Sequence, residues 1–170
     1  HAQNLKVTTQ SDLEQMRYLL SKKKQSPKPK NSLEKNTYIL VGSTGGIGKE
    51  IHKLLEKEGA KVIPISRSSK KHPIHLENPS SIKKALAAIY EEEGEVDGLI
   101  NTAGYLRIDP LKTLSFQDIH QIINVNLTGV IYACKEARIR KGGHIINFAS
   151  SSFAKGRGGY GIYSACKAAI

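Results

Sequence analysis

The sequence predicts an α/β protein in which helices cover both faces of a doubly wound parallel sheet. Short apolar segments that suit buried strands alternate with longer segments whose apolar residues recur at helical spacing. The connections are short, so the strand–helix–strand units are expected to be right-handed and their strands parallel. A glycine-rich turn at 42–48 joins the first of these strands to its helix. At 170 residues, the chain is long enough for one domain with a hydrophobic core.

The expected strands and helices follow one another from Thr37 onward. Tyr38–Val41 is an apolar run that suits a strand buried on both faces. The next strand, Lys61–Ile65, contains Pro64, which removes one hydrogen-bond donor and favours a sheet edge or a strand end. The helix expected at Ser80–Glu93 has a row of apolar residues on one face. The remaining expected elements are helices at 47–58, 116–137 and 160–170 and strands at 96–101 and 144–149.

Composition divides the chain into three parts. Residues 37–170 carry the alternation of strands and helices, and within the first part, residues 1–20, a short strand followed by a helix is expected at 4–20. Residues 21–36 have the composition of a basic linker, because lysine and proline interleave there without aromatic residues. The chain starts at His1 and stops at Ile170 inside a helical stretch. We therefore expect both ends to be cut and the sheet to be incomplete at the C-terminus.

Basic residues outnumber acidic ones, and the formal net charge is +11 at pH 7. Part of this excess lies in the segment 21–36, where an arm that binds nucleic acid is the alternative to a solvated linker. We favour the linker and expect no nucleic-acid partner. The remaining excess suits anionic small molecules, such as a phosphorylated cofactor or substrate.

The two cysteines, Cys134 and Cys166, stand far apart and outside any CxxC spacing. This favours reduced thiols in a cytoplasmic protein over a disulfide or a metal site. No apolar run approaches the roughly 18–20 residues that span a bilayer, and no secretory signal pattern is present. The sequence therefore predicts a cytoplasmic protein with no membrane partner and no bound metal.

The glycine-rich turn lies between a buried strand and a helix, which is the context of a phosphate-binding turn. Its first glycine permits the tight turn, its third lets the backbone approach a pyrophosphate, and its last lets the helix pack close to the sheet. The free N–H groups at the helix N-terminus attract phosphate. The alternative is a turn without a ligand. The expected cofactor-binding residues here are Gly42, Ser43, Thr44, Gly46, Ile47 and Gly48.

Ser66-Arg67-Ser68 follows the second strand, where a carboxylate would bind the ribose hydroxyls of NAD. A guanidinium pairs well with the additional 2′-phosphate of NADP, and neighbouring hydroxyls can donate to the same group. Ser66 and Arg67 therefore predict NADPH/NADP as the cofactor. The alternative is that Arg67 is only a solvated loop cation.

A second constellation stands near the end of the chain. Tyr163 and Lys167 are four residues apart on an expected helix and so share one face. An ammonium beside a phenol favours the phenolate and brings acid–base work closer to neutral pH. Ser150 lies thirteen residues before Tyr163, at the carboxyl end of an expected strand, where doubly wound sheets place their ligands.

These motifs together resemble the short-chain dehydrogenase/reductase family, which has a Rossmann-like fold. The spacing Gly-x-x-x-Gly-Ile-Gly is similar to the family's glycine motif, although Val41 stands where the family usually has threonine. The family often places an aspartate near the adenine after its third strand. His75 or Glu77 occupies that region here, so the adenine contact stays open.

Asn101-Thr102-Ala103-Gly104 is similar to the family's Asn-Asn-Ala-Gly segment, with Thr102 in place of the second asparagine. The resemblance implies that Asn101, Ala103 and Gly104 contact the cofactor. It also implies that the family fold continues past residue 170 and that the full-length protein is a homo-oligomer. By themselves, residues 1–170 are expected to be inactive, because the sheet keeps an unpaired edge and the substrate pocket lacks a wall.

The family's catalytic residues match Asn126, Ser150, Tyr163 and Lys167, and the thirteen-residue spacing selects Ser150 from three consecutive serines. The implied reaction is hydride transfer from a nicotinamide to a carbonyl carbon, with Tyr163 protonating the alkoxide and Ser150 orienting the carbonyl oxygen. Lys167 would hold the nicotinamide ribose and tune Tyr163, so both also count as cofactor-binding residues. Asn126 would anchor a water that relays the proton.

Residues 4–20 resemble the C-terminal end of methylerythritol-phosphate-type cytidylyltransferases, which often runs Lys-Val-Thr-Thr-Pro-Glu-Asp-Leu; Gln10 and Ser11 replace the proline and glutamate. An ordinary amphipathic extension is the alternative. The resemblance implies a fusion junction, as in bifunctional ribulose 5-phosphate reductase/CDP-ribitol pyrophosphorylases, where NADPH reduces ribulose 5-phosphate to ribitol 5-phosphate. The substrate would then be a small phosphorylated carbonyl compound. Another carbonyl, such as a 3-oxoacyl thioester, and a catalytically silent nucleotide-binding or dimerisation module are the alternatives.

Overall fold

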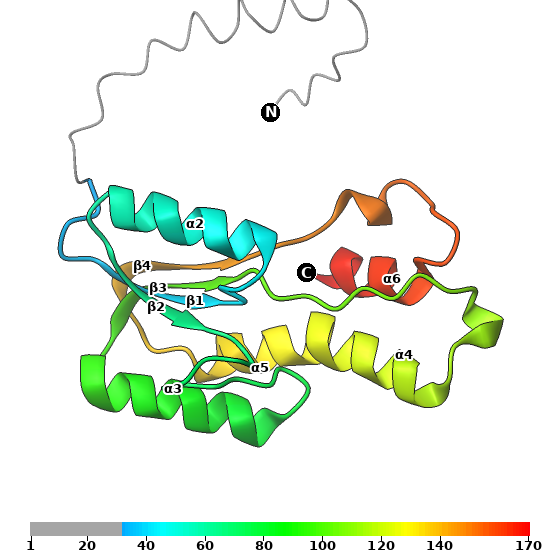
Figure 1. The fold of residues 1–170 in the computed structure, drawn as a ribbon, viewed down its shortest axis with the longest axis horizontal. Helices are drawn as coiled ribbons and strands as arrows, with labels where there is room; N and C mark the ends of the chain where they lie inside the picture. The colour runs from blue at the N-terminus through cyan, green and yellow to red at the C-terminus, as the bar shows by residue number, and fades with distance from the viewer. Residues whose placement is uncertain (1–31) are drawn as a thin grey trace, which may run out of the picture. The chain divides into compact units, whose positions relative to one another are not determined.

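The computed structural model describes residues 32–170, so the strand and helix predicted at 4–20 and most of the linker at 21–36 lie outside the described residues. The described part contains a sheet of four parallel strands in the order β2-β1-β3-β4. Helix α2 covers one face of the sheet, and α3 and α5 cover the other (Figure 1). The prediction of an α/β fold with a doubly wound parallel sheet is confirmed.

The elements lie close to their predicted positions. The strands are β1 (Thr37–Val41), β2 (Lys61–Ile65), β3 (Val96–Asn101) and β4 (Ile139–Asn147). The α-helices are α2 (Gly46–Lys57), α3 (Pro79–Glu93), α4 (Phe116–Ile123), α5 (Gly129–Glu136) and α6 (Gly161–Ala169). Two short 3-10 helices, η1 (Leu111–Thr113) and η3 (Ser151–Phe153), and a π-helical turn, η2 (Asn124–Thr128), complete the described chain.

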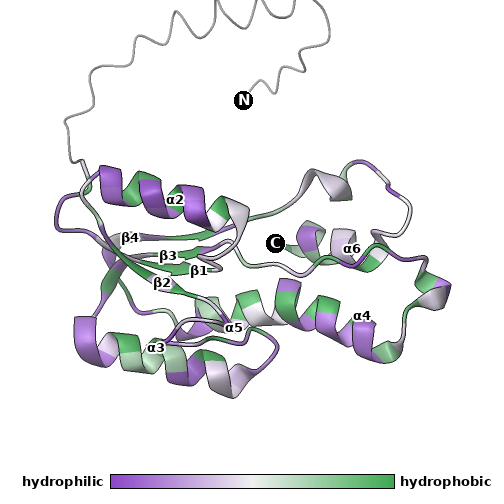
Figure 2. Ribbon diagram, in the orientation of Figure 1, coloured by the Kyte–Doolittle hydropathy of each residue, from purple (hydrophilic) through white to green (hydrophobic). Residues whose placement is uncertain are grey.

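Two apolar clusters hold the layers together, one on each face of the sheet. Strand β1 contributes to both, because its side chains alternate between the faces. Ile39 and Val41 belong to the cluster that also contains the apolar face of α3, whereas Tyr38 and Leu40 pack with Leu55 of α2. In Figure 2 strands β1, β2 and β3 are coloured mainly as hydrophobic, while helices α2 and α3 alternate between hydrophobic and hydrophilic bands. The predicted core faces of β1 and α3 are therefore confirmed.

Strand β4 differs from the prediction of a strand at 144–149. It begins five residues earlier, because Ile139 pairs with Val96 before the register shifts and His144 pairs with Gly98. Gly142, at φ 87°, lies within this irregularity and has the left-handed conformation of the glycine in one class of β-bulge. At its other end the strand stops at Asn147, and the chain leaves the sheet before Ser150.

The helix predicted at 116–137 is interrupted by the π-helical turn η2 between α4 and α5. Two side chains compete there for helical carbonyl groups. Asn126 Nδ2 donates to Ile122 O at 2.8 Å, and Thr128 Oγ1 donates to Asn124 O at 3.3 Å. Such bonds to carbonyls four residues earlier disturb the α-helical ladder.

Pro64 lies exposed in β2, which forms an edge of the described sheet, as its sequence position predicts. Both cysteines are free thiols. No helix among residues 32–170 has the length and apolar character that crossing a membrane requires. The same residues contain no cluster of three or more His, Cys, Asp or Glu side chains that could hold a metal ion. The cytoplasmic location stays a prediction.

Candidate active site

The glycine turn between β1 and α2 is tight because two of its glycines leave no room for a side chain. Gly42 has a φ of 85°, and a Cβ there would lie 2.5 Å from the backbone nitrogen of Ala103. A Cβ on Gly48 would overlap the carbonyl oxygen of Gly42. These contacts bring the first turn of α2 against the end of β1 and the segment that follows β3.

Helix α2 begins at Gly46 with no side-chain cap from Gly45 and no acidic residue in its first turn. The first N–H groups of an α-helix have no partner within the helix and carry its partial positive charge. The space beside Gly46 is open, since a Cβ there would meet no atom within 4 Å. The turn can therefore receive an anion against its backbone. Ser43 is turned away toward the sheet, where its Oγ donates to Ile65 O at 3.4 Å.

A cleft of about 630 Å³ opens beside this turn, at the carboxyl ends of β1, β2 and β3. This volume lies within the range of ligand-binding clefts. Six predicted cofactor residues border it: Gly42, Thr44, Ser66, Arg67, Ala103 and Gly104. The lining also contains Gly45, Ser68, Tyr105, Gln121 and Val125, which the sequence prediction did not include as site residues. The other predicted residues of the glycine turn do not border the cleft: Ser43, Gly46, Ile47 and Gly48.

The segment after β2 presents hydroxyl groups around one exposed guanidinium. Ser66 Oγ lies 3.2 Å from both Ser68 Oγ and Ser69 Oγ, and Ser69 Oγ accepts a bond from Ser66 N at 2.8 Å. Arg67 is exposed on the cleft, and no described acidic residue forms an ion pair with it. The predicted pair Ser66 and Arg67 thus stands on the same cleft as the glycine turn. Glu77 also borders the cleft, whereas His75 does not.

The segment after β3 is tied to the strands on either side. Thr102 Oγ1 donates to Val41 O at 2.8 Å, so the residue that departs from the expected asparagine links β3 to β1. Asn101 Nδ2 donates to Asn147 Oδ1 at 2.6 Å and thereby links β3 to β4. Asn101 is buried and does not border the cleft. Asn147 was missed by the sequence reasoning, because the register of β3 and β4 alone brings these two amides together.

Asn126 is completely buried in η2, and its side chain clamps the segment after β3. Its Nδ2 donates to Tyr105 O at 2.7 Å and to Ile122 O at 2.8 Å, while its Oδ1 accepts from Tyr105 N at 3.1 Å. Both amide protons are therefore used within the protein. Tyr105 lies next to Gly104 on the cleft, so Asn126 fixes part of the cleft wall.

Helix α6 carries Tyr163 and Lys167, and the predicted proximity of their side chains is present. Lys167 Nζ lies 5.9 Å from the centroid of the Tyr163 ring. The same Nζ donates to Phe148 O at 2.8 Å, which ties α6 to the segment after β4. Lys167 is buried, and this burial lowers the pKa of its ammonium from the ordinary value. Ser150 caps η3, where its Oγ accepts a bond from Ser152 N at 3.2 Å.

The elements that carry the four predicted catalytic residues pack together, because α6 contacts both η2 and η3. The structure thus gathers Asn126, Ser150, Tyr163 and Lys167 at the carboxyl end of the sheet, beyond β3 and β4 (Figure 1). Among the described hydrogen bonds, none joins the hydroxyls of Ser150 and Tyr163, and none of the four residues borders the cleft. The cleft reaches their neighbourhood through Val125, which precedes Asn126.

Comparison with known proteins gives the family. Residues 36–170 match the family model described as short chain dehydrogenase. The chain is 37% identical over 135 residues to the bifunctional ribulose 5-phosphate reductase/CDP-ribitol pyrophosphorylase Bcs1 of Haemophilus influenzae, covering 78% of this chain and 28% of that protein. It is 33% identical over 158 residues to the 3-oxoacyl-[acyl-carrier-protein] reductase FabG of Vibrio cholerae, covering 82% of this chain and 64% of that protein.

Solved structures agree with this match. A short chain dehydrogenase from Burkholderia cenocepacia in complex with NADP superposes with a TM-score of 0.75 at 27% identity, covering 81% of this chain and 64% of that chain. A short-chain dehydrogenase/reductase from Brucella melitensis gives a TM-score of 0.74 at 26% identity, covering 81% of this chain and 66% of that one. The chain belongs to the short-chain dehydrogenase family.

Proposed function

We propose that this chain forms the nucleotide-binding and catalytic part of an NADPH-dependent carbonyl reductase that reduces ribulose 5-phosphate to ribitol 5-phosphate. The observation that carries the proposal is the position of Arg67 on the same cleft as Gly42 and Gly45, the glycines that lead into the N-terminus of α2. A dinucleotide with a 2′-phosphate presents two anionic groups, a pyrophosphate and a phosphate, which these two features would receive separately. The NADP complex of the Burkholderia relative supports the same cofactor here.

The described residues fit this cofactor. The free N–H groups at the start of α2, next to Gly45 on the cleft, would hold the pyrophosphate, and the open space beside Gly46 leaves room for it. Arg67 and the hydroxyls of Ser66 and Ser68 would hold the 2′-phosphate, since a guanidinium and neighbouring O–H groups can donate to it together. NADPH, when bound, supplies the hydride.

The chain's own side chains would manage the substrate oxygen and its proton. Tyr163 would donate its hydroxyl proton to the oxygen that becomes an alkoxide. Ser150 accepts a hydrogen bond from Ser152 N, which leaves its own O–H free to orient the substrate carbonyl. Lys167 uses one N–H on Phe148 O and keeps two for a ribose hydroxyl and its surroundings.

Asn126 would act differently from the simplest expectation. Its two side-chain protons are bound to Tyr105 O and Ile122 O, so a water in a proton relay would have to bind its backbone carbonyl or the remaining lone pair of Oδ1. We propose that the Asn126 side chain holds the cleft wall at Tyr105. A water that relays the proton would then bind the backbone carbonyl or Oδ1 of Asn126.

The two relatives are named for different substrates. Bcs1 is named for ribulose 5-phosphate reduction, whereas FabG is named for 3-oxoacyl groups on a carrier protein. We favour the ketose phosphate because Bcs1 is the more similar of the two and because the chain has a strong basic excess. A cytidylyltransferase domain ahead of the chain, and a homo-oligomeric full-length protein, belong to the same proposal.

The test uses the complete gene product that contains this chain. NADPH and NADH are titrated by fluorescence, and then NADPH consumption is measured with ribulose 5-phosphate and, separately, with a 3-oxoacyl thioester. We expect tighter binding of NADPH than of NADH, and turnover of the ketose phosphate. Turnover of the thioester alone would transfer the assignment to the second substrate. Failure to bind NADPH would overturn the enzyme proposal and favour a silent module.

A further inference from the structure

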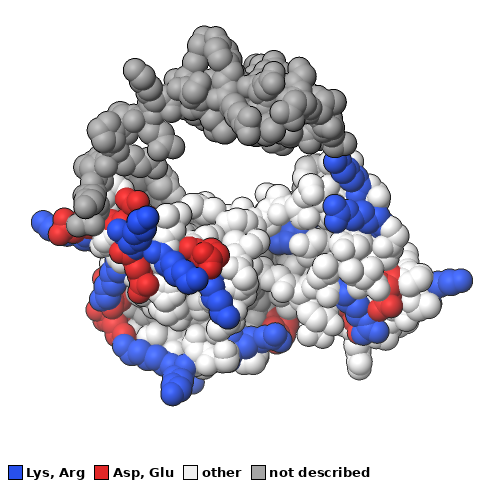
Figure 3. All heavy atoms as spheres, turned by 45° about the horizontal axis from the view of Figure 1, so that its top comes forward, with Lys and Arg blue, Asp and Glu red and all other residues white. Residues whose placement is uncertain are grey.

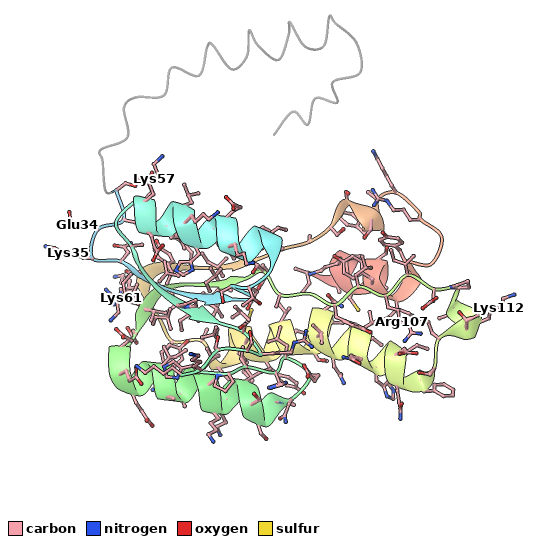
Figure 4. All side chains as sticks on the ribbon, viewed as in Figure 1. Glu34, Lys35, Lys57, Lys61, Arg107 and Lys112 are labelled. Atoms are coloured by element: carbon pink, nitrogen blue, oxygen red, sulfur yellow. The ribbon has the colours of Figure 1, made fainter. Side chains whose placement is uncertain are left out.

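Two arginines lie on loops that meet beside the predicted catalytic tyrosine. Arg107 follows β3 (Figure 4), and Arg157 lies between η3 and α6. The loops are joined by a hydrogen bond from Asp109 N to Gly159 O at 3.3 Å. Gly159 has a φ of 79°, and a Cβ there would crowd Ile108 at 2.9 Å, so the loops meet closely.

The charge of Arg107 is already neutralised within the protein. Its Nε donates to Asp109 Oδ2 at 2.7 Å, and its Nη1 donates to Asp118 Oδ1 at 2.5 Å. The two carboxylates outweigh the single positive charge of the guanidinium, so this group of side chains does not attract a further anion. Arg107 therefore connects the loop after β3 to the first turn of α4.

Arg157 has no such partner. It is exposed, and no acidic residue among residues 32–170 forms an ion pair with it. Figure 3 shows basic side chains at the upper right of the described unit with no acidic side chain between them in that view. Lys155, two residues earlier, is also exposed and without a described acidic partner, so the loop carries two uncompensated positive charges.

A ring contact fixes the place of this guanidinium. The Cζ of Arg157 lies 5.7 Å from the centroid of the Tyr160 ring, and Tyr160 N donates to Arg157 O at 3.2 Å. The Tyr160 ring in turn meets the Tyr163 ring edge to face, with centroids 6.3 Å apart. Arg157 is therefore held two ring contacts away from the phenol. A cation–π contact of this kind uses no N–H group as a hydrogen-bond donor to an acceptor atom, so the guanidinium keeps its donors for an anion.

We propose that Arg157 binds the phosphate of a phosphorylated carbonyl substrate whose carbonyl group lies at Tyr163, which makes it a specificity-determining residue of the proposed site. This inference rests on the proposed function, because it takes Tyr163 as the proton donor. In an extended ketose 5-phosphate the phosphorus lies about 6 Å from the carbonyl carbon, given single bonds of about 1.5 Å. The two ring contacts place Arg157 Cζ within about 12 Å of the Tyr163 centroid, and such a substrate with a hydrogen bond of about 2.8 Å at each end spans a comparable distance. A guanidinium binds phosphate through paired N–H groups.

The experiment compares Arg157→Gln with a matched control, Lys84→Gln, which removes an exposed positive charge from α3 on the far side of the sheet. The complete gene product is assayed with ribulose 5-phosphate and with unphosphorylated ribulose. Arg157→Gln should raise KM for the phosphorylated substrate about 10- to 100-fold, as expected for loss of a charge-assisted hydrogen bond. Its kinetics with ribulose and its NADPH affinity should match the wild type, and Arg157→Lys should recover part of the loss.

Three outcomes would overturn the inference: an equal loss on both ketoses, a loss no greater than that of Lys84→Gln, or a loss seen only with an acyl carrier protein substrate. If the wild-type protein reduces another carbonyl but no ketose phosphate, the substrate assignment fails separately. Inhibition of that reduction by ribitol 5-phosphate then tests whether Arg157 binds a phosphate group. Inhibition that disappears in Arg157→Gln supports phosphate binding there, and inhibition that is absent or unchanged contradicts it.

Discussion

Replacement of Asn126 by alanine should destabilise the protein and loosen the cofactor cleft. The side chain makes three hydrogen bonds, two with the backbone of Tyr105 and one with Ile122 O, from a completely buried position. At about 1 kcal/mol net for each bond, the loss should be about 3 kcal/mol of unfolding free energy. Because Tyr105 lies on the cleft, NADPH should also bind more weakly.

Asn124→Ala is the matched control within the same π-helical turn. Asn124 is half-buried, and its Oδ1 accepts one hydrogen bond, from Thr128 Oγ1 at 3.1 Å. Its replacement should cost about 1 kcal/mol or less. Urea denaturation gives the unfolding free energies, and fluorescence titration gives the NADPH affinities. A loss for Asn126→Ala within about 0.5 kcal/mol of the control would refute the clamp at Tyr105.

Three further predictions concern the turn, the cofactor choice and the buried lysine. Gly48→Ala should lower the free energy of unfolding by about 1–3 kcal/mol, because its Cβ would overlap Gly42 O. Gly46→Ala should leave the stability unchanged, because a Cβ there would meet no atom within 4 Å. Thermal unfolding without cofactor measures both, and equal effects of the two substitutions would contradict this packing. Arg67→Gln should weaken NADPH binding about 10- to 100-fold and leave NADH binding unchanged, and a parallel loss of both would exclude a 2′-phosphate contact. Burial lowers the pKa of Lys167 in the folded protein. At pH values just below the ordinary lysine pKa, the unfolded chain therefore binds more protons than the folded one, and the free energy of unfolding should rise with pH. This rise should be present in the wild type and absent in Lys167→Met. Equal pH slopes in urea denaturation would count against this burial effect.

Local patterns in the sequence were sufficient for most of the fold. The apolar run of β1 and the apolar face of α3 depend on residues close together in the chain, and both were predicted correctly. The start of β4 was not, because it depends on the pairing of Ile139 with Val96 across the sheet. The π-helical turn also escaped prediction, since it reflects bonds that the Asn126 side chain makes only in the folded helix.

The candidate site also contains some features that local sequence patterns predict and others that depend on contacts between distant segments. The glycine turn and the Ser66–Arg67 pair occupy short segments whose spacing fixes their geometry, and the structure places both on one cleft. Tyr163 and Lys167 are brought together by helical spacing alone. The position of Tyr105 on the cleft wall and the proposed role of Arg157 depend on contacts between segments that are distant in the sequence, and no local pattern marks such contacts.

The most direct test of the reductase proposal follows NADPH consumption by the complete gene product with ribulose 5-phosphate, in the wild type and in Tyr163→Phe. Removal of the phenolic hydroxyl takes away the proposed proton donor and leaves Lys167 and the cleft in place. We predict that the variant binds NADPH like the wild type but loses at least about 100-fold in kcat. Undiminished turnover by Tyr163→Phe, or no turnover of any carbonyl substrate by a wild-type protein that binds NADPH, would contradict the account.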